Sequence, residues 1–247
     1  MANSKKTNSN LDLDISADSI LEFVRFNTGV KRFDIHTKEW YFDNRMTKSQ
    51  KIINIAVIIQ FFTGLRMNEI VKMSFSQLLE LSKKKKVRIE LSKTKNRKTR
   101  NIELKAKDFK ANKLHRELVN LLKDWLKFKQ DFLVVSKNMN PKPKTIKKAN
   151  GKTYQTYYFV YINNFIAKVN AKLKLFVAKK ESENKAFLPN HIEKLTTHGF
   201  RNNFIVSVYK YTGNDIVATK LLIGHSDISI TDGYISKYKA NEIINPY

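Results

Sequence analysis

The sequence predicts a mixed α+β fold that is mainly α-helical and contains a small antiparallel β-sheet or hairpin. Two observations support this prediction. Apolar residues recur at helical spacing through most of the chain of 247 residues. Apolar and polar residues alternate, as in a half-buried strand, at Val87, Ile89 and Leu91 and again at Ile102 and Leu104. The hydrophobic content of 42% is that of a globular protein with a sizeable core.

The composition limits the class of partner. The net charge of +25 at pH 7 favours nucleic acid first and an anionic membrane second. The longest apolar run, IINIAVIIQFFTGL, has only about fourteen residues and contains Asn54 and Gln60, so it is too short and too polar to span a bilayer. The absence of cysteine excludes disulfides, zinc fingers and thiol nucleophiles, and it fits an intracellular protein.

The N-terminal part is predicted to be a mobile polar tail over residues 1–12, followed by a first helix over residues 16–28. Thr47 and Gln50 have the spacing of a capping box, in which each side chain bonds the backbone N–H of the other residue. The helix that follows is apolar almost all round, so we expect it at the centre of the core, ended by Gly64.

A second amphipathic helix is predicted over Met67 to Leu79, and a basic hairpin follows it. Thirteen basic and three acidic residues lie in residues 81–110. The alternation predicts two strands there, joined by a basic loop over residues 92–100. A charge run of this kind is usually a solvated hairpin.

The C-terminal half is predicted to be mostly helical. Apolar spacing predicts helices over residues 114–128, residues 154–177, a segment starting near His198, and residues 216–222. Residues 131–135 are predicted as a short strand, and residues 136–152, which are rich in lysine, as an exposed basic loop that contacts DNA. Four tyrosines near the start of the 154–177 segment could stack on bases, but at helical spacing they more often belong to the core: Tyr154, Tyr157, Tyr158 and Tyr161.

The last fifty residues have the chemistry of a phosphate site. His198 and Arg201 are three residues apart and share one face of a helix. A helix stop at Gly224 leaves His225 just beyond it, and Tyr234 follows nine residues later. An arginine fork fits two phosphate oxygens, a histidine can move a proton near neutral pH, and a tyrosine can act as a nucleophile.

A second arginine, Arg66, lies upstream in the run TGLRMNEI. Taken alone, Arg66 could simply form a surface ion pair with Glu69 on the next turn. The runs TGLRMNEI, SKTKNRKTRNIEL, HGFR and LIGHSDISITDGY, in this order, resemble the catalytic domain of tyrosine recombinases, the phage integrase family. These motifs extend from about Thr63 to Tyr234, which is most of the chain.

The resemblance implies the tyrosine-recombinase catalytic-domain fold for residues 13–247, and six catalytic residues. These are Arg66, Lys93, His198, Arg201, His225 and the nucleophile Tyr234. The arginines and His225 bind the phosphate, His198 assists the proton transfer from the tyrosine, and Lys93 protonates the leaving oxygen. Counting back from the second strand assigns the lysine role to Lys95 instead, so the choice between the two stays open. No metal, ATP or other cofactor is implied.

The resemblance also implies the partners. Family members act as a tetramer on two double-stranded DNA sites, so we expect a homotetramer on DNA, possible monomers in free solution, and no membrane partner. The expected place of action is the cytoplasm, at the nucleoid, or the host cell if the chain comes from a virus. About sixty residues precede Thr63, so a separate N-terminal DNA-binding domain is expected to be absent from this chain. Asn202 stands where the family usually has histidine.

Two alternatives use the same observations. A type IB topoisomerase would perform the same chemistry on one duplex without needing a specific site. A DNA-binding protein without catalysis would explain the charge equally well, but it would not need all six polar positions to be occupied.

Overall fold

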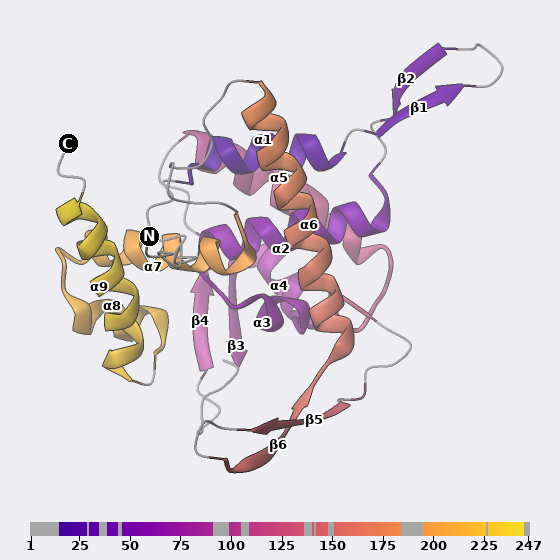
Figure 1. Ribbon diagram of the computed structural model, residues 1–247. Helices are drawn as coiled ribbons and strands as arrows, with labels where there is room; N and C mark the ends of the chain where they lie inside the picture. Colours follow the sequence, from indigo (N-terminus) through magenta and orange to yellow (C-terminus); the bar gives the residue numbers. More distant parts are fainter. Residues whose placement is uncertain are drawn as a thin grey trace, which may run out of the picture.

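The computed structural model describes residues 15–28, 30–34, 39–43, 46–90, 99–104, 109–135, 140, 142–147, 151–183, 195–225 and 227–244. Within these ranges helices predominate, and the strands form three separate antiparallel hairpins (Figure 1). The predicted fold class, mainly helical with a small antiparallel sheet, is therefore confirmed, although hairpins occur at three places. None of the described helices is long and apolar enough to cross a membrane.

The helices follow one another along the chain as α1 (Ala17–Thr28), α2 (Lys48–Thr63), α3 (Met67–Val71), α4 (Phe75–Lys84), α5 (Phe109–Leu126), α6 (Val160–Ser182), α7 (Thr197–Tyr211), α8 (Ile216–Ile223) and α9 (Ile228–Ile244). The hairpins pair β1 (Val30–Asp34) with β2 (Glu39–Asp43), β3 (Lys86–Glu90) with β4 (Thr99–Glu103), and β5 (Lys142–Lys147) with β6 (Thr153–Tyr158).

Helix α2 forms the centre of the core, as its apolar surface predicts. Its middle residues, Ile55 to Ile59, are fully buried, and α1, α5 and α7 pack around it. Burying one such isoleucine contributes about 1.5–3 kcal/mol. The predicted capping box is confirmed: the Thr47 hydroxyl accepts the Gln50 N–H at 3.2 Å, and the Gln50 amide oxygen accepts the Thr47 N–H at 2.7 Å. The helix ends at Gly64, whose φ of 61° is left-handed.

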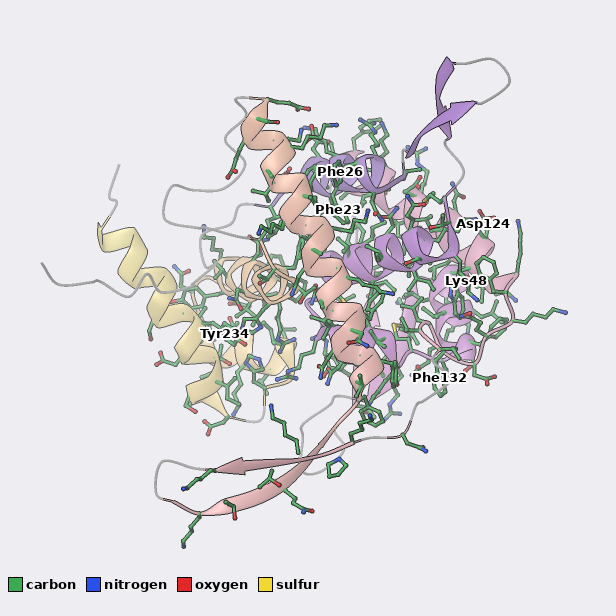
Figure 2. The ribbon with its side chains drawn as sticks, turned by 45° about the vertical axis from the view of Figure 1, so that its right-hand side comes forward. Phe23, Phe26, Lys48, Asp124, Phe132 and Tyr234 are labelled. Carbon is green, nitrogen blue, oxygen red and sulfur yellow. The ribbon has the colours of Figure 1, made fainter. Side chains whose placement is uncertain are left out.

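The first helix and the long helix α6 cover one side of this core. Phe23 and Phe26 of α1 point toward α6, where both rings contact Phe176 at centroid distances of 5.7 and 5.6 Å (Figure 2). Helix α1 occupies almost the residues predicted for it. Helix α5 begins five residues before the predicted start, at Phe109, and keeps its apolar face on the core.

The last three helices form a smaller cluster beside the main core. Ile205, Tyr209, Ile223 and Ile235 are its buried residues, and they come from α7, α8 and α9 (Figure 1). Helix α7 also packs on α2, so it joins the smaller cluster to the main core. This joint lies where α2 ends and α7 begins, and the candidate site forms there.

Two local predictions for the segments around Ser74 are wrong. The predicted helix over Met67 to Leu79 is broken into α3 and α4, because Ser74 and Gln77 form a second capping box that starts a new helix. The Ser74 N–H donates to the Gln77 amide oxygen at 2.9 Å, and the Gln77 N–H donates to the Ser74 hydroxyl at 3.3 Å. The predicted strand over residues 131–135 is only a single bridge between Phe132 and Ser74.

The basic loop predicted over residues 136–152 is also partly wrong. Residues 142–147 form strand β5, which pairs with β6, and this hairpin extends away from the body of the molecule (Figure 1). The helix predicted over residues 154–177 starts only at Val160, because the preceding run TYQTYY is rich in residues that favour strands. The rest of the predicted loop lies partly outside the described residues, and the predicted tail over residues 1–12 lies wholly outside them.

The four tyrosines near the start of α6 were predicted to belong to the core. Tyr161 is buried, as the core interpretation predicts, whereas the side chains of the other three tyrosines lie outside the description. The hairpin of β1 and β2 was not predicted from the sequence.

Candidate active site

The loop after α2 fixes Arg66 at the edge of a cleft. The N–H of Gly64 donates to the Gln60 carbonyl at 2.8 Å and closes the helix. The Gln60 side-chain amide then donates to the Leu65 carbonyl at 3.0 Å. The Arg66 N–H donates to Glu69 at 2.8 Å, so Arg66 is the residue from which α3 starts. A left-handed glycine and two side-chain bonds therefore determine the backbone position of Arg66.

The Arg66 guanidinium forms the ion pair that the sequence suggested as the alternative to a phosphate role. Its Nη1 lies 3.2 Å from the Glu69 carboxylate. The Glu69 side chain is only 1% exposed, however, and that of Arg66 is 28% exposed, so this is not a pair of surface charges. The buried carboxylate orients the guanidinium, and the exposed part of Arg66 lines the cleft. Arg66 therefore forms the ion pair with Glu69 and also lines the cleft.

Helix α7 delivers His198 and Arg201 to the same cleft from its first two turns. The Thr196 hydroxyl caps the helix by accepting the Gly199 N–H at 3.3 Å. His198 is exposed, whereas Arg201, one turn further, is buried and donates through Nη1 to the carbonyl of Gly64. Their spacing of three residues places them on one helix face, as predicted. The N-terminus of α7 adds a partial positive charge at this point.

His225 lies directly after the left-handed Gly224 that ends α8, as predicted. Its Nε2 lies 2.9 Å from Nη2 of Arg201, and its Nδ1 lies 2.8 Å from the Thr231 hydroxyl. Because a guanidinium can only donate, Nε2 accepts and the ring proton is on Nδ1, which donates to Thr231. Burial, reinforced by the nearby arginines, lowers the pKa of His225 from 6.5 to about 4. His225 is therefore neutral at pH 7.

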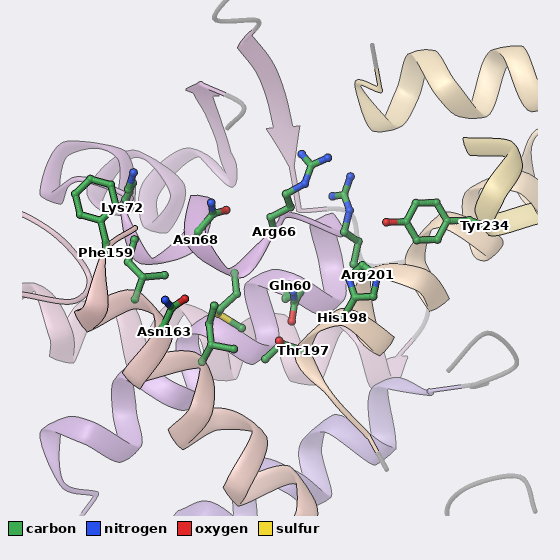
Figure 3. Close-up of a pocket in the computed structure, with 13 residues that line it drawn as sticks. Gln60, Arg66, Asn68, Lys72, Phe159, Asn163, Thr197, His198, Arg201 and Tyr234 are labelled. Atoms are coloured by element: carbon green, nitrogen blue, oxygen red, sulfur yellow. The ribbon is translucent and has the colours of Figure 1, made fainter. Parts of the chain in front are cut away.

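Tyr234 lies in the second turn of α9, between the two histidines. Its ring is stacked on His225, with a centroid distance of 5.8 Å and an interplanar angle of 19°, and it lies 6.0 Å from the His198 ring. The side chain points toward Arg201, with its hydroxyl foremost (Figure 3). Burial lowers the pKa of Arg201, as does the neighbouring Arg66, while the Tyr234 side chain opposes this shift.

Arg100 was not predicted as a site residue, yet it lies directly behind the other arginines. On β4, its Nη1 donates to the Ile223 carbonyl at 3.1 Å and its Nη2 donates to the Thr63 carbonyl. Burial and the charge of Arg201 lower its pKa to about 10. The sequence did contain a signal, because Arg100 has the same parity as Ile102 and Leu104 and so belongs to the inward face of its strand.

The cleft in front of these residues is large and positive. Its volume is about 780 Å³, and side chains from α2, α3, α6, α7 and α9 line it (Figure 3). Arg66 and Arg201 line it, whereas Arg100 does not. Among the described residues, Glu69 is the one carboxylate whose charge acts on the pKa of Arg100 and of Arg201, and it opposes the lowering of both. The buried Nε of Arg201 has no hydrogen-bond partner among the described residues. Such a site suits an anion with several oxygen atoms.

The opposite end of the cleft carries a further cation. The ammonium of Lys72 lies 4.2 Å from the centre of the Phe159 ring, beside Asn163 (Figure 3). Among the described residues, no group of three or more His, Cys, Asp or Glu side chains could hold a metal ion.

Some predicted residues cannot be placed. Lys93 and Lys95 both lie outside the described residues, between β3 and β4. The structure thus brings together Arg66, His198, Arg201, His225 and Tyr234, and it leaves the lysine assignment open. Asn202 is buried, next to Arg201 in α7.

The sequence model of the phage integrase family matches residues 41–241. Crystal structures of the XerH site-specific recombinase bound to difH substrate and to palindromic difH substrate match with a TM-score of 0.51 and 18% identity. The Tn1549 transposon integrase in complex with circular intermediate DNA matches with a TM-score of 0.48 and 16% identity. No curated protein sequence matches the chain.

Each comparison covers a larger share of this chain than of the other protein's chain. The two XerH comparisons cover 95% and 94% of this chain but 55% and 51% of the XerH chains, so this chain spans about half their length. The Tn1549 comparison covers 89% of this chain and 61% of the integrase chain. At these identities, the XerH likeness shows a shared fold.

Proposed function

The chain belongs to the phage integrase family, and from this premise we propose that it is a site-specific DNA recombinase that cleaves and rejoins DNA strands through a 3′-phosphotyrosine. One observation carries the proposal. Tyr234 points its hydroxyl at the buried Arg201, between two histidines, in a cleft that Arg66 also lines. This combination presents a nucleophile to a bound phosphodiester.

In the proposed reaction, Arg66 and Arg201 bind the two non-bridging oxygens of the phosphate that is cleaved. Charge grows on these oxygens as the phosphorus becomes pentacovalent, and fixed cations stabilise that charge more than the charge of the ground state. The partial positive charge at the start of α7 acts on the same oxygens.

His225 has a role that the structure supports in a modified form. The family resemblance assigns it a hydrogen bond to the phosphate, but both of its ring nitrogens are already engaged, by Arg201 and Thr231. In this state His225 orients the Arg201 fork. It would contact the phosphate directly only after Nη2 of Arg201 turned away from it.

The bonds change in one displacement. The hydroxyl oxygen of Tyr234 forms a bond to phosphorus, while the bond from phosphorus to the 5′ oxygen breaks. The tyrosine proton passes to His198, and Lys93, or Lys95 in the alternative register, protonates the leaving oxygen. The 5′ hydroxyl of a partner strand then attacks the phosphotyrosine and reverses these steps, so neither a metal nor ATP is consumed.

The proposed partner is double-stranded DNA with a specific recombination site. The net charge of +25 supports a polyanionic partner. We propose that four copies assemble on two sites and that the free protein is monomeric. Action on DNA would place it in the cytoplasm at the nucleoid, or in the host cell if the chain is viral.

A covalent-trapping assay tests the proposal. Nicked duplexes from the genomic neighbourhood of the coding sequence are incubated with the protein, and the protein is denatured in detergent and separated by electrophoresis. Tyr234→Phe removes only the nucleophilic oxygen. Tyr211→Phe is the matched control, because Tyr211 is 72% exposed and lies at the end of α7, outside the cleft.

The possible outcomes are distinct. Adducts at one sequence, present with Tyr211→Phe and absent with Tyr234→Phe, support the recombinase. Adducts at many sequences, together with relaxation of supercoiled plasmid, would favour a type IB topoisomerase. Tight, salt-dependent DNA binding without any adduct would contradict catalysis and favour a DNA-binding protein.

A further inference from the structure

Arg100 connects the ends of two helices that are far apart in the sequence. One amine of its guanidinium donates to the carbonyl of Thr63, the last residue of α2. The other donates at 3.1 Å to the carbonyl of Ile223, the last residue of α8. Both acceptors belong to helix C-termini, which have carbonyls without partners in the helix and a partial negative charge. A guanidinium suits this place because its two amines diverge from one rigid plane.

A residue of the candidate site follows each of these helix ends within three residues. Arg66 comes three residues after Thr63, and His225 comes two residues after Ile223. Both loops start with a left-handed glycine, so each has a fixed path from the helix end to the site residue. The distance between the two helix ends therefore sets the distance between Arg66 and the pair formed by His225 and Arg201.

A second chain of bonds leads to the same two loops from the front of the site. Arg201 donates to the carbonyl of Gly64 through one amine and to His225 through the other. Arg201 faces the cleft, whereas Arg100 borders a separate hollow on the far side of α2's end, with Phe62 and Phe204. The two arginines thus link the same pair of loops from opposite sides, and only Arg201 lies where a phosphate would bind.

We propose that Arg100 is a positioning residue: it holds the loops of Arg66 and His225 at the separation that a phosphate requires and keeps His225 an acceptor for Arg201. This inference rests on the proposed function, and it adds a residue outside the predicted set of six. Its charge matters as well as its shape. Arg100 is one of three arginines, with Arg201 and Arg66, that together with burial lower the pKa of His225. A protonated His225 could not accept from Arg201.

Two substitutions separate the effect of the forked guanidinium donors of Arg100 from the effect of its positive charge. Arg100→Lys keeps a positive charge but places all donors on a single nitrogen, and Arg100→Met removes both charge and donors at similar length. Arg88→Met is the matched control: Arg88 lies on the paired strand β3, is exposed, and within the described part of the chain its side chain donates to Thr99 of the same hairpin. All four proteins are first compared by thermal unfolding, and assays are run well below the lowest midpoint.

Three quantities are measured for each protein: the rate of adduct formation on nicked DNA, the Kd for the same DNA, and the titration of the His225 ring by NMR. The His225 signal is identified from its loss in His225→Gln. We expect both Arg100 variants to slow adduct formation by about tenfold to a hundredfold while Kd stays within about threefold, because small displacements of reacting groups cost this much. Arg88→Met should match the wild type.

The titration separates positioning from simple stabilisation. Arg100→Met should raise the midpoint of His225 from about 4, and the acid limb of the adduct rate should move upward with it. Arg100→Lys should leave the midpoint near that of the wild type although its rate is low. Variants of Arg100 that are less stable but retain the wild-type rate, Kd and titration would overturn the inference. If the wild type itself forms no adduct, the proposed function fails, and an unmoved His225 midpoint in Arg100→Met would then overturn the positioning role separately.

Discussion

The site residues show how buried charges are arranged for a ligand. Glu69 balances Arg66, and helix-end carbonyls accept from Arg100 and Arg201, so the guanidiniums are held by neutral as well as charged groups. Removing positive charges from water is costly unless they are well bonded. One carboxylate does not neutralise three guanidiniums, so the site keeps a net positive charge that suits an anion.

The resemblance to the tyrosine recombinase family allowed much of this site to be predicted. Arg66, His198, Arg201, His225 and Tyr234 meet at one cleft, as the motif order suggested. Arg100 was missed because a basic run between two strands is usually a solvated loop. That interpretation was preferred although Arg100 alternates in step with Ile102 and Leu104, which face inward. The hydrogen bonds that join His225 to Arg201 and Thr231 were not predictable either, because Thr231 looks like an ordinary polar residue in the sequence.

The buried neutral His225 should make stability depend on pH. Unfolded histidine binds a proton near pH 6.5, whereas folded His225 does so only near pH 4, so the unfolded state binds more protons between these values. The free energy of unfolding should therefore fall as the pH falls through this window, by about 2 kcal/mol between pH 7 and pH 5 from this residue. Urea unfolding at both pH values measures it. His225→Gln should lack this part of the decrease, and an equal decrease in both proteins would contradict the assignment.

Gly64 should be essential for the turn that leads to Arg66. Its φ is +61°, and an added Cβ would lie 2.1 Å from the Phe204 ring. Gly64→Ala should therefore destabilise the protein by about 2–5 kcal/mol, from the left-handed backbone and from overpacking together. Gly213→Ala is the control, since Gly213 has a φ of +67° but nothing within 4 Å. It should cost only about 1–2 kcal/mol, and equal losses in urea unfolding would argue against the close contact with Phe204.

At the scale of elements, capping signals proved more reliable than apolar spacing. Both capping boxes that the structure shows at α2 and α4 are visible in the sequence, but only the first was used, and the second explains why a predicted helix is broken at Ser74. The hairpin of β5 and β6 was missed for another reason. Lysine and proline favour a loop, and strand pairing between Lys142 and Tyr158 depends on a partner that local sequence does not specify.

The hairpin of β5 and β6 should contribute to DNA affinity through charge. Lys142, Lys144 and Lys147 are exposed on β5, which projects from the body of the molecule (Figure 1). Replacing the three lysines by glutamine should weaken binding at low salt and reduce the slope of log K against log salt by about 2–3, if each lysine neutralises one phosphate. The control replaces three exposed cations of α5, Lys113, Arg116 and Lys123, by glutamine. Equal slopes for the two triple variants would remove the hairpin from the DNA interface.

At the scale of the whole molecule, the fold joins a large core around α2 to a small cluster of α7, α8 and α9, and the site lies along that joint. Fold class was predictable because it follows from the apolar periodicity of long helices. The joint was not, because it depends on which helix ends meet. Side chains of α2, α3, α6, α7 and α9 line the cleft there, and only the tertiary structure brings these separate stretches of the chain together.

The charge of the whole molecule should couple assembly to DNA. Free copies with a net charge of +25 repel one another, and DNA phosphates neutralise that charge. Mass photometry should show particles of 28.9 kDa without DNA and complexes of four protomers with two duplexes when the recombination site is added. A stable tetramer without DNA, or a single protomer on each duplex at saturation, would contradict the proposed assembly.

The most direct test of the central claim identifies the atom that DNA becomes attached to. The trapped adduct is digested with nuclease and protease, and the peptide that carries the nucleotide is sequenced by mass spectrometry. We predict a nucleotide joined through its 3′ phosphate to Tyr234, with a free 5′ hydroxyl on the released strand. A nucleotide on any other residue, or one joined through its 5′ phosphate, would contradict the arrangement of Tyr234, Arg66 and Arg201 as the centre of strand cleavage.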